Sequence, residues 1–372
     1  MFRTIRNLVV SIMAMFISDR EARHAFRNKY KIKSKFRKLR DDNRRLFNDI
    51  QALRGELGAL RAHYNRRFEE WEVDRSFNFR AEPLDDLPPQ GPDSEVFLAV
   101  TSVVKNEGPY LREWIEYHKI VGVERFYLYD NESDDDTKKI LEPYIKEGTV
   151  VYHHLANHPI TRKVPIVEAY NDAIYKYRDR VRWMAVIDAD EFIVPVEKDS
   201  IPEFLADYDQ YPGVVANWMC FDSNGHDKKP TAHGGLLTAN FTRVRKEHNH
   251  NLGGMGIHKD TTVKSIVNPK LVLRYNSEHY AIYYRNFRAV TENYEMVYGQ
   301  ITGVHSSNKI RVNHYVTKSR EEYLDKINRN SKNTNNAYWM RDMLLNFQEE
   351  TTEDLAIQKY VPRLMRAMGL KD

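Results

Sequence analysis

The chain has one cysteine, Cys220, among its 372 residues. A single thiol cannot form an intramolecular disulfide, and it cannot supply the several thiolates of a cysteine-based zinc cluster. Small secreted domains that depend on disulfides are therefore excluded, and the composition is typical of a reducing compartment. We expect Cys220 itself to be a small buried hydrophobic residue.

Long apolar runs are also scarce near the N-terminus. Residues 8–17 (LVVSIMAMFI) form an apolar stretch of only ten residues, whereas a membrane-spanning helix needs about 20. The residues that follow, SDRE, do not resemble the small-residue cleavage site of a signal peptide. We therefore predict neither a transmembrane helix nor a signal peptide here.

Three familiar sequence patterns are absent. No G-x-G-x-x-G follows the first expected strand and no G-x-x-x-x-G-K-[ST] occurs, which argues against dinucleotide-binding and P-loop proteins. The chain has 14 histidines, but none has the spacing of H-E-x-x-H or of a zinc finger. A zinc enzyme is therefore not expected.

The net charge is small, +4, but it is unevenly placed. Residues 1–45 hold 14 Lys or Arg and 4 Asp or Glu, a local excess of +10, so the remainder of the chain sums to 4 − 10 = −6. A nucleic-acid enzyme needs a basic working face. We therefore expect no nucleic-acid partner.

Residues 1–38 predict a basic amphipathic helix. One helical face collects apolar side chains, and a basic run follows it. The apolar face consists of Ile5, Leu8, Val9, Ile12 and Phe16. Such a segment lies well on an anionic membrane, where each basic residue adds about 1 kcal/mol. We predict a peripheral position on the cytoplasmic face of a membrane; the alternative is a helix packed on the body of the protein.

Residues 39–75 carry a heptad pattern. Apolar or seam residues recur with spacings of 4 and 3, at Leu39, Asn43, Leu46, Ile50, Leu53, Leu57, Leu60 and Tyr64. This period of about 3.5 predicts a coiled coil and a homo-oligomer, although one amphipathic helix folded back on its own domain would give the same pattern. The proline-rich residues 76–94 then form a linker.

Strand and helix patterns alternate from residue 95 onward. We expect strands at 96–104, 125–129, 150–154, 181–187, 214–221 and 264–267, and helices at 110–121, 137–147 and 164–178. This alternation predicts an α/β domain over 95–330, with a mostly parallel sheet covered by helices on both faces. A helical tail at 331–372 would follow. Ligands of such sheets bind at the carboxyl ends of the strands.

An acidic pair, Asp188 and Asp190, ends the strand predicted at 181–187. Mg²⁺ and similar hard cations bind one or two carboxylates together with ligand phosphates. The position therefore suits a divalent metal that faces a phosphorylated ligand. A solvated acidic loop is the alternative, so the neighbouring sequence has to decide.

Four sequence segments, which follow one another along the chain, supply the information needed to interpret the acidic pair. They are VVKNEGPYLREWIEYHKIVGVERFYLYDNESDDDT (103–137), WMAVIDADEFIV (183–194), VKSIVNP (263–269) and NHYVTKSREEYLDKINR (313–329). Together they resemble the glycosyltransferase family 2-like and family 92-like proteins, which have the GT-A fold, a Rossmann-like α/β architecture. The resemblance spans roughly residues 96–330.

The resemblance implies a nucleotide-sugar donor, with a UDP-sugar favoured, and Mn²⁺ or Mg²⁺. Asp190 would coordinate the metal, Asp188 would contact the ribose or assist the metal, and His314 would complete the metal shell. Asp130 would bind the base ring. Further donor contacts are expected at Lys105, Asn106, Glu107, Arg162, Lys163 and Lys264.

Sugar transfer with inversion also needs a carboxylate that takes the proton of the acceptor hydroxyl. Asp222, Asp260 and Glu278 are the candidate bases, and their spacing does not choose between them. The ordinary alternative for each is a surface carboxylate.

These observations predict a metal-dependent, inverting glycosyltransferase of surface polysaccharide biosynthesis that acts on a glycan or lipid-linked acceptor. Two alternatives stay open at this point. One is a non-catalytic, membrane-associated scaffold with a degenerate transferase domain. The other is a nucleotidyltransferase, which also uses paired carboxylates and a metal.

Overall fold

The computed structural model describes seven stretches of the chain, which are residues 20–25, 94–158, 164–245, 249–251, 257–259, 261–330 and 351–371. The chain divides into two units, residues 1–78 and 79–372. Of the first unit, residues 20–25 are described and are helical. The predicted coiled coil, most of the predicted amphipathic helix and all but the last residue of the linker lie outside the described residues. Among the helices that are described, none has the length and apolar character needed to cross a bilayer.

The second unit is built on an eight-stranded sheet with strand order β3-β2-β1-β4-β10-β6-β13-β5. Its strands are β1 (Val96–Val104), β2 (Arg125–Asp130), β3 (Val150–His154), β4 (Val181–Val186), β5 (Glu191–Pro195), β6 (Gly213–Cys220), β10 (Val263–Val267) and β13 (Ile310–His314). The smaller pairs are β11 (Val272–Tyr275) with β12 (Ala281–Tyr283), β14 (Thr351–Glu353) with β7 (Arg243–Arg245), and β8 (Asn249–Asn251) with β9 (Ile257–Lys259).

The large sheet is mixed but mostly parallel. Strands β3, β2, β1 and β4 run parallel to one another, and β13 runs parallel to β6. Strand β10 is antiparallel to both of its neighbours, β4 and β6, and β5 is antiparallel to β13 at the edge. The prediction of an α/β chain with a mostly parallel sheet is therefore confirmed.

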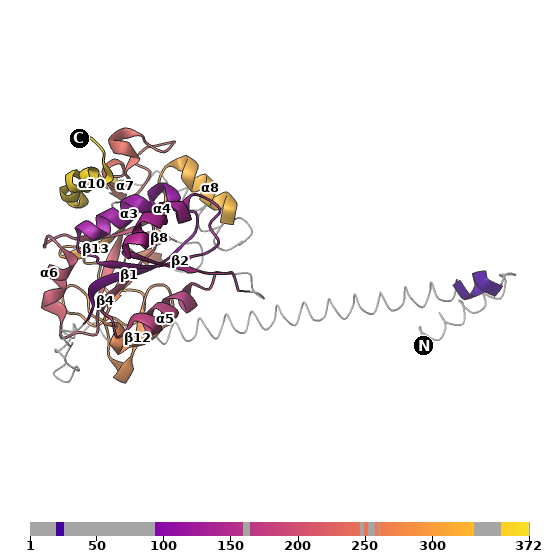
Figure 1. Cartoon of the computed structure of the whole chain (residues 1–372), viewed down its shortest axis with the longest axis horizontal. Helices are drawn as coiled ribbons and strands as arrows, with labels where there is room; N and C mark the ends of the chain where they lie inside the picture. Colours follow the sequence, from indigo (N-terminus) through magenta and orange to yellow (C-terminus); the bar gives the residue numbers. More distant parts are fainter. Residues whose placement is uncertain are drawn as a thin grey trace. The chain divides into compact units, whose positions relative to one another are not determined.

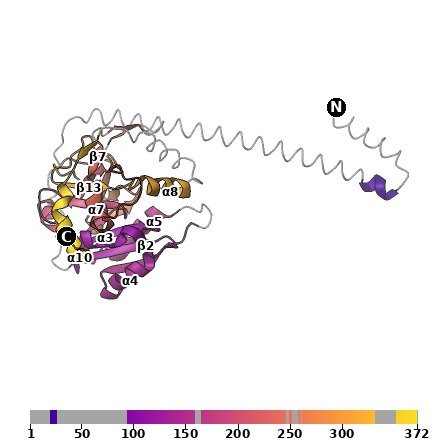
Figure 2. The same cartoon turned by 90° about the horizontal axis from the view of Figure 1, so that it is seen from above.

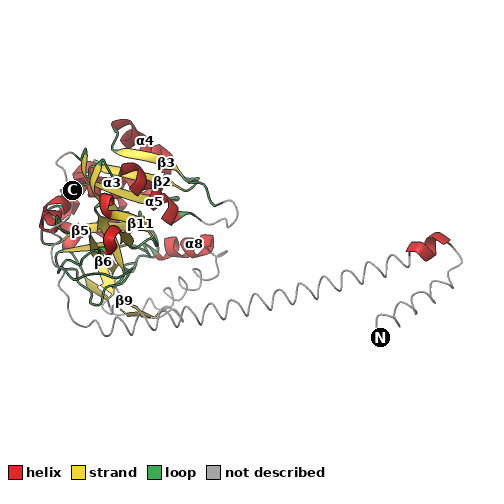
Figure 3. Cartoon of the chain, turned by 90° about the horizontal axis from the view of Figure 1, so that it is seen from below, coloured by secondary structure: helices red, strands yellow, loops and turns green. Residues whose placement is uncertain are grey.

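Helices cover both faces of the sheet (Figures 1 and 3). The helices are α3 (Gly108–Ile120), α4 (Thr137–Glu147), α5 (Ile166–Tyr177), α6 (Ile201–Leu205), α7 (Leu237–Asn240), α8 (Arg320–Asn330) and α10 (Val361–Met368). Helix α3 packs against α4 and α10 over one hydrophobic core, and Figure 2 shows α10 beside α3. Helix α5 packs against β1 and β11 over a second core on the other face.

The first half of the domain follows the sequence pattern closely. Strands β1 and β3 and helix α4 have the predicted bounds. Helix α3 begins at Gly108, because Pro109 fits the first turn of a helix. Strands β5 and β13 were not predicted: β5 follows β4 after only a short turn, and β13 (IRVNH) has polar residues at buried positions.

Helix α3 anchors the edge strand β5 through buried polar contacts. The indole Nε1 of Trp114 donates a hydrogen bond to the carbonyl oxygen of Glu191 at 2.7 Å. Tyr117 donates its hydroxyl to the carbonyl of Ile193 at 3.0 Å, and the amide of Ile193 donates to His118 Nε2 at 3.3 Å. These bonds fix the backbone of β5, which begins at the residue after Asp190, against helix α3.

The imidazole of His118 is fully buried, and burial lowers its pKa to about 3. An exposed histidine in the unfolded chain titrates near about 6.5. Between these two values the unfolded state binds more protons than the folded state, so the free energy of unfolding falls as the pH falls below about 6.5.

We therefore expect the wild type to lose about 1.4 kcal/mol more stability than His118→Gln between pH 7.5 and pH 5.5. Urea unfolding followed by circular dichroism at both pH values measures the difference. Comparison with the variant removes the contribution of every other titrating group. Equal losses in the two proteins would contradict a buried neutral imidazole.

Candidate functional site

The predicted site residues follow strands that end at the same edge of the sheet. Strands β1, β2 and β4 are parallel, so the residues after them, beginning at Lys105, Asn131 and Ile187, lie side by side. Strand β10 runs the other way and places Lys264 at this edge beside the end of β4. Strand β13 ends at His314, which pairs with Glu191 in β5. The topology thus gathers segments that are far apart in the sequence.

Asp188 is held by a buried lysine. Lys264 Nζ lies 2.8 Å from Asp188 Oδ2 and 3.5 Å from Glu191 Oε2. Tyr170, from α5, donates its hydroxyl to Asp188 Oδ1 at 3.2 Å. Burial opposes ionisation of Asp188, but the Lys264 ammonium outweighs it and lowers the pKa of this carboxyl. The side chain of Lys264 is only 1% exposed, so this cation is fixed within the fold.

Asp190 lies between a lysine and a histidine. Lys326 Nζ, from α8, is 2.9 Å from Asp190 Oδ2, and His314 Nε2 is 3.6 Å from Asp190 Oδ1. Burial disfavours the charged carboxylate, but Lys326 and His314 together hold the pKa of Asp190 well below its usual range. Asp190 is therefore an ionised carboxylate in a nearly closed site.

Asp190 and His314 are the residues at this edge that could hold a divalent metal. Among the described residues, no group of three or more His, Cys, Asp or Glu side chains is arranged to hold a metal ion. However, Mg²⁺ commonly takes one or two protein carboxylates and completes its shell with ligand phosphates. A cation with bonds of about 2.1 Å fits between Asp190 Oδ1 and His314 Nε2, which are 3.6 Å apart. The pair fits a metal that is shared with a phosphorylated ligand.

Asp130 and its neighbours tie two loops together. Asp130 Oδ1 accepts a hydrogen bond from the amide of Ser133 at 3.0 Å, and Oδ2 accepts one from the hydroxyl of Tyr152 at 2.8 Å. Oδ1 therefore stabilises the loop after β2, and Oδ2 ties the end of β2 to β3. Lys105 Nζ donates to the carbonyl of Asn131 at 2.8 Å. Asn106 has a φ of 56°, a left-handed conformation that asparagine tolerates well.

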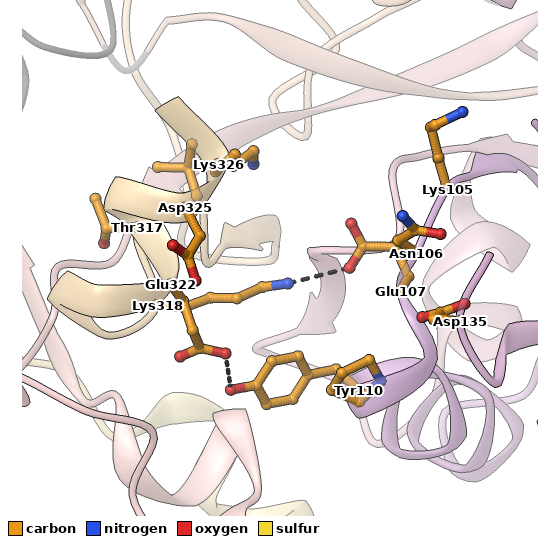
Figure 4. Close-up of a pocket in the computed structure, with 12 residues that line it drawn as sticks. Lys105, Asn106, Glu107, Tyr110, Asp135, Thr317, Lys318, Glu322, Asp325 and Lys326 are labelled. Carbon is orange, nitrogen blue, oxygen red and sulfur yellow. Dashed lines mark hydrogen bonds and ion pairs between the residues drawn. The ribbon is translucent and has the colours of Figure 1, made fainter. Parts of the chain in front are cut away.

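A cavity of about 580 Å³ opens beside these loops (Figure 4). One wall is Lys105, Asn106, Glu107, Pro109, Tyr110 and Asp135, and the other is Val316, Thr317, Lys318, Glu322, Asp325 and Lys326. Two bonds cross it: Lys318 Nζ lies 3.1 Å from Glu107 Oε2, and the Tyr110 hydroxyl donates to Glu322 at 2.6 Å. Its size lies within the range of roughly 300–1,000 Å³ that is usual for ligand pockets.

Two of the three candidate bases are described. Asp222 follows β6 near His314, since the amide of Phe221 donates to the His314 carbonyl at 3.0 Å, and Asp222 Oδ1 accepts from the amide of Asn224 at 2.7 Å. Glu278 has a half-exposed side chain, and its carbonyl accepts from Lys264 Nζ at 3.2 Å. Asp260, Arg162 and Lys163 lie outside the described residues.

Sequence reasoning missed three residues that contact the site. Lys326 and Lys318 follow β13, inside a block that carried the family resemblance, yet nothing in their local spacing marks them. Tyr170 lies on the buried face of α5, where it reads as an ordinary core aromatic. Only the position of α5 and α8 over the sheet edge brings Tyr170 and Lys326 to the acidic pair, whereas Lys318 pairs with Glu107 across the cavity.

The fold and the site together define a class: α/β proteins with an ionised carboxylate pair and a histidine at the carboxyl edge of a mixed sheet. Within the sequence, residues 99–354 match the model of glycosyltransferase family 92. The chain therefore belongs to glycosyltransferase family 92, which confirms the resemblance.

Individual relatives are similar to this chain over shorter stretches than the family model. A family 92 glycosyltransferase of Arabidopsis thaliana is 33% identical over 129 residues, which cover 34% of this chain and 21% of that protein. The galactan beta-1,4-galactosyltransferase GALS2 of Arabidopsis thaliana is 28% identical over 132 residues, covering 31% of this chain and 24% of the relative. The chain thus matches only about a quarter or less of the length of these relatives.

Solved structures show more distant likeness. The TarS 1–349 structure from S. aureus is 13% identical with a TM-score of 0.34, covering 61% of this chain and 62% of that one. The mannosyltransferase PcManGT from Pyrobaculum calidifontis, in complex with GDP-Man and Mn²⁺, is 16% identical with a TM-score of 0.27, covering 42% and 44%. Likeness at these TM-scores does not define the fold of this chain.

Proposed function

We propose that the chain is a glycosyltransferase that moves a sugar from a nucleotide-sugar donor to a glycan or lipid-linked acceptor, on a GT-A type of sheet. One observation carries the proposal. The acidic pair and His314 meet at the carboxyl edge of the sheet in a chain whose residues 99–354 match glycosyltransferase family 92. Ligands of α/β sheets bind at this edge.

The proposed mechanism is a displacement with inversion at the anomeric carbon. A carboxylate takes the proton of the acceptor hydroxyl, the acceptor oxygen bonds to the anomeric carbon, and the bond from that carbon to the nucleoside diphosphate breaks. Asp222 and Glu278 are the described candidates for the base. A divalent cation, when bound to Asp190 and His314, would neutralise the charge that develops on the leaving diphosphate.

The remaining residues hold this arrangement in place. Lys264 and Tyr170 fix the Asp188 carboxylate, leaving its orientation ready for a donor contact. The Trp114 bond to the Glu191 carbonyl fixes the backbone that follows Asp190. Such preorganised polar groups stabilise charge without having to reorganise during the reaction.

The setting of the reaction is proposed from the N-terminal sequence. Residues 1–38 would rest on an anionic membrane at its cytoplasmic face, and residues 39–75 would join copies of the chain through a coiled coil. Anchoring of this kind suits an acceptor that is itself membrane-bound, as in the synthesis of a surface polysaccharide.

A thermal-shift screen of nucleotide sugars, each with Mn²⁺, tests the proposed function. Ligand present at about 100 times its Kd should add about 2.7 kcal/mol of stability, so the correct donor should raise the melting temperature by several degrees. UDP-sugars are the first donors to try. The donor that binds is then assayed for hydrolysis and transfer. Absence of a shift with every donor would favour the non-catalytic alternative.

A further inference from the structure

The two lysines at the acidic pair differ in their freedom to move. Lys264 is 1% exposed and is fixed by Asp188, Glu191 and the Glu278 carbonyl. The side chain of Lys326 is 33% exposed, although it contacts an Asp190 carboxylate that is only 9% exposed. Lys326 also lines the 580 Å³ cavity. Its ammonium therefore stands at the boundary between the acidic pair and the open cavity.

The partner that balances the charge of Lys326 should change when a divalent cation binds at Asp190. In the free chain Lys326 balances the ionised Asp190 at 2.9 Å. A divalent cation between Asp190 and His314 would take over this balance, and the ammonium would then face a cation across a short distance. Lysine has a flexible four-carbon stem and a compact charge, and it commonly binds phosphate as a point charge. The cavity is where its ammonium can turn.

The partial exposure of the Lys326 side chain keeps the free-energy cost of this movement modest. Because Lys326 is one-third exposed, it can leave the carboxylate without becoming an unpaired buried charge, which would be expensive. Lys264 has no such path, since its surroundings enclose it. The donor contact predicted for Lys264 is therefore better assigned to Lys326.

We propose that Lys326 exchanges partners: it pairs with Asp190 in the free chain and with the diphosphate of the donor when a divalent cation occupies Asp190 and His314. The inference rests on the proposed function, and it makes Lys326 the residue that couples binding of the metal to binding of the donor. Lys326 then competes with the metal for Asp190 in the absence of donor. With donor bound, it strengthens the binding of both ligands, and such coupling is reciprocal.

The test compares the full-length wild type with Lys326→Met and Lys326→Arg. Mn²⁺ affinity is measured by the electron paramagnetic resonance signal of free Mn²⁺, with and without UDP, and UDP affinity is measured by calorimetry with and without Mn²⁺. Lys139→Met is the matched control, because Lys139 is an exposed lysine on α4. Circular dichroism and melting temperature report folding of each variant.

For Lys326→Met we expect Mn²⁺ to bind about fivefold more tightly without UDP, and UDP to bind about tenfold more weakly with Mn²⁺ present. Lys326→Arg keeps the charge and should keep both affinities close to those of the wild type. Lys139→Met should behave as wild type.

Two failures are distinguishable. If the wild type binds UDP and Mn²⁺ but Lys326→Met binds both unchanged, the exchange of partners is wrong and the proposed function stands. A weaker Mn²⁺ affinity of Lys326→Met without UDP also overturns the exchange, since it would mean that Lys326 supports the metal rather than competing with it. If the wild type binds neither Mn²⁺ nor any nucleoside diphosphate, the proposed function fails, and the inference fails with it.

Discussion

Replacement of Asp190 by asparagine is expected to lower kcat/KM for sugar transfer about 100- to 1,000-fold, the usual cost of removing one preorganised charged contact from a transition state. The asparagine keeps the size of the side chain but cannot supply a full negative charge to a cation or to His314 and Lys326. Lys326 is partly exposed, so it stays solvated and the fold should survive. Initial rates with the donor found in the thermal-shift screen, in the presence of Mn²⁺, measure the effect.

Asp199→Asn is the matched control. Asp199 is also a carboxylate near a lysine, 3.8 Å from Lys359 Nζ, but its side chain is 93% exposed. Surface pairs of this kind contribute little, so the control should keep the wild-type rate. A wild-type rate in Asp190→Asn, with melting temperatures unchanged in both variants, would place the reacting site elsewhere.

Trp114→Ala is expected to cost about 3–5 kcal/mol of unfolding free energy, the range for removing a large aromatic side chain from a core. The indole is fully buried, packs against His118 and Phe126, and donates to the Glu191 carbonyl. Domains of ordinary stability have only about 5–15 kcal/mol in total. Urea unfolding followed by circular dichroism gives the change, since fluorescence would lose one of its reporters.

Two further variants separate the causes. Trp114→Phe keeps an aromatic ring but removes the Nε1 donor, so it should cost less than the alanine and still leave the Glu191 carbonyl short of a partner, worth about 1–3 kcal/mol. Tyr175→Ala removes an aromatic side chain that is 63% exposed and should change stability by about 0.5 kcal/mol or less. A loss below 1 kcal/mol in Trp114→Ala would mean that α3 does not anchor β5.

The sequence predicts the first half of the sheet well for a local reason. From β1 to β4, strands and helices alternate with clear periodicity, and the acidic pair follows a strand that is apolar apart from Arg182. Pattern and structure agree there because each element is buried in the way that its own residues indicate.

The second half depends on contacts that local pattern cannot show. Strand β13 has Arg311 and Asn313 at fully buried positions, where Arg311 pairs with Asp354. Arg311 is tolerated because its partner Asp354 comes from a segment 43 residues away, and the Arg311 Nε in turn donates to Asn313 Oδ1 at 3.0 Å. The antiparallel insertion of β10 between β4 and β6 is likewise decided by the whole sheet.

The residues of the candidate site also fall into two groups, those that the sequence indicates and those that only the packing of the fold brings together. Asp188 and Asp190 were recognisable because they follow a strand, and His314 because it lies in a block that resembles a family. Lys326 and Tyr170 were not, because only the packing of α8 and α5 brings them near. Asp130 was recognisable as a polar residue at a strand end, but its bonds to Ser133 and Tyr152 could not be read from spacing.

The order of these parts along the chain has a consequence for synthesis. Asp188 and Lys264 are 76 residues apart, and Asp190 and Lys326 are 136 residues apart. A growing polypeptide therefore presents its carboxylates well before the ammonium groups that balance them. Until residue 326 has been added, burial of Asp190 would lack the ammonium group that balances it at 2.9 Å, so the acidic edge should stay hydrated while the strands beneath it are already pairing. The ligand pocket is thus a late product of translation.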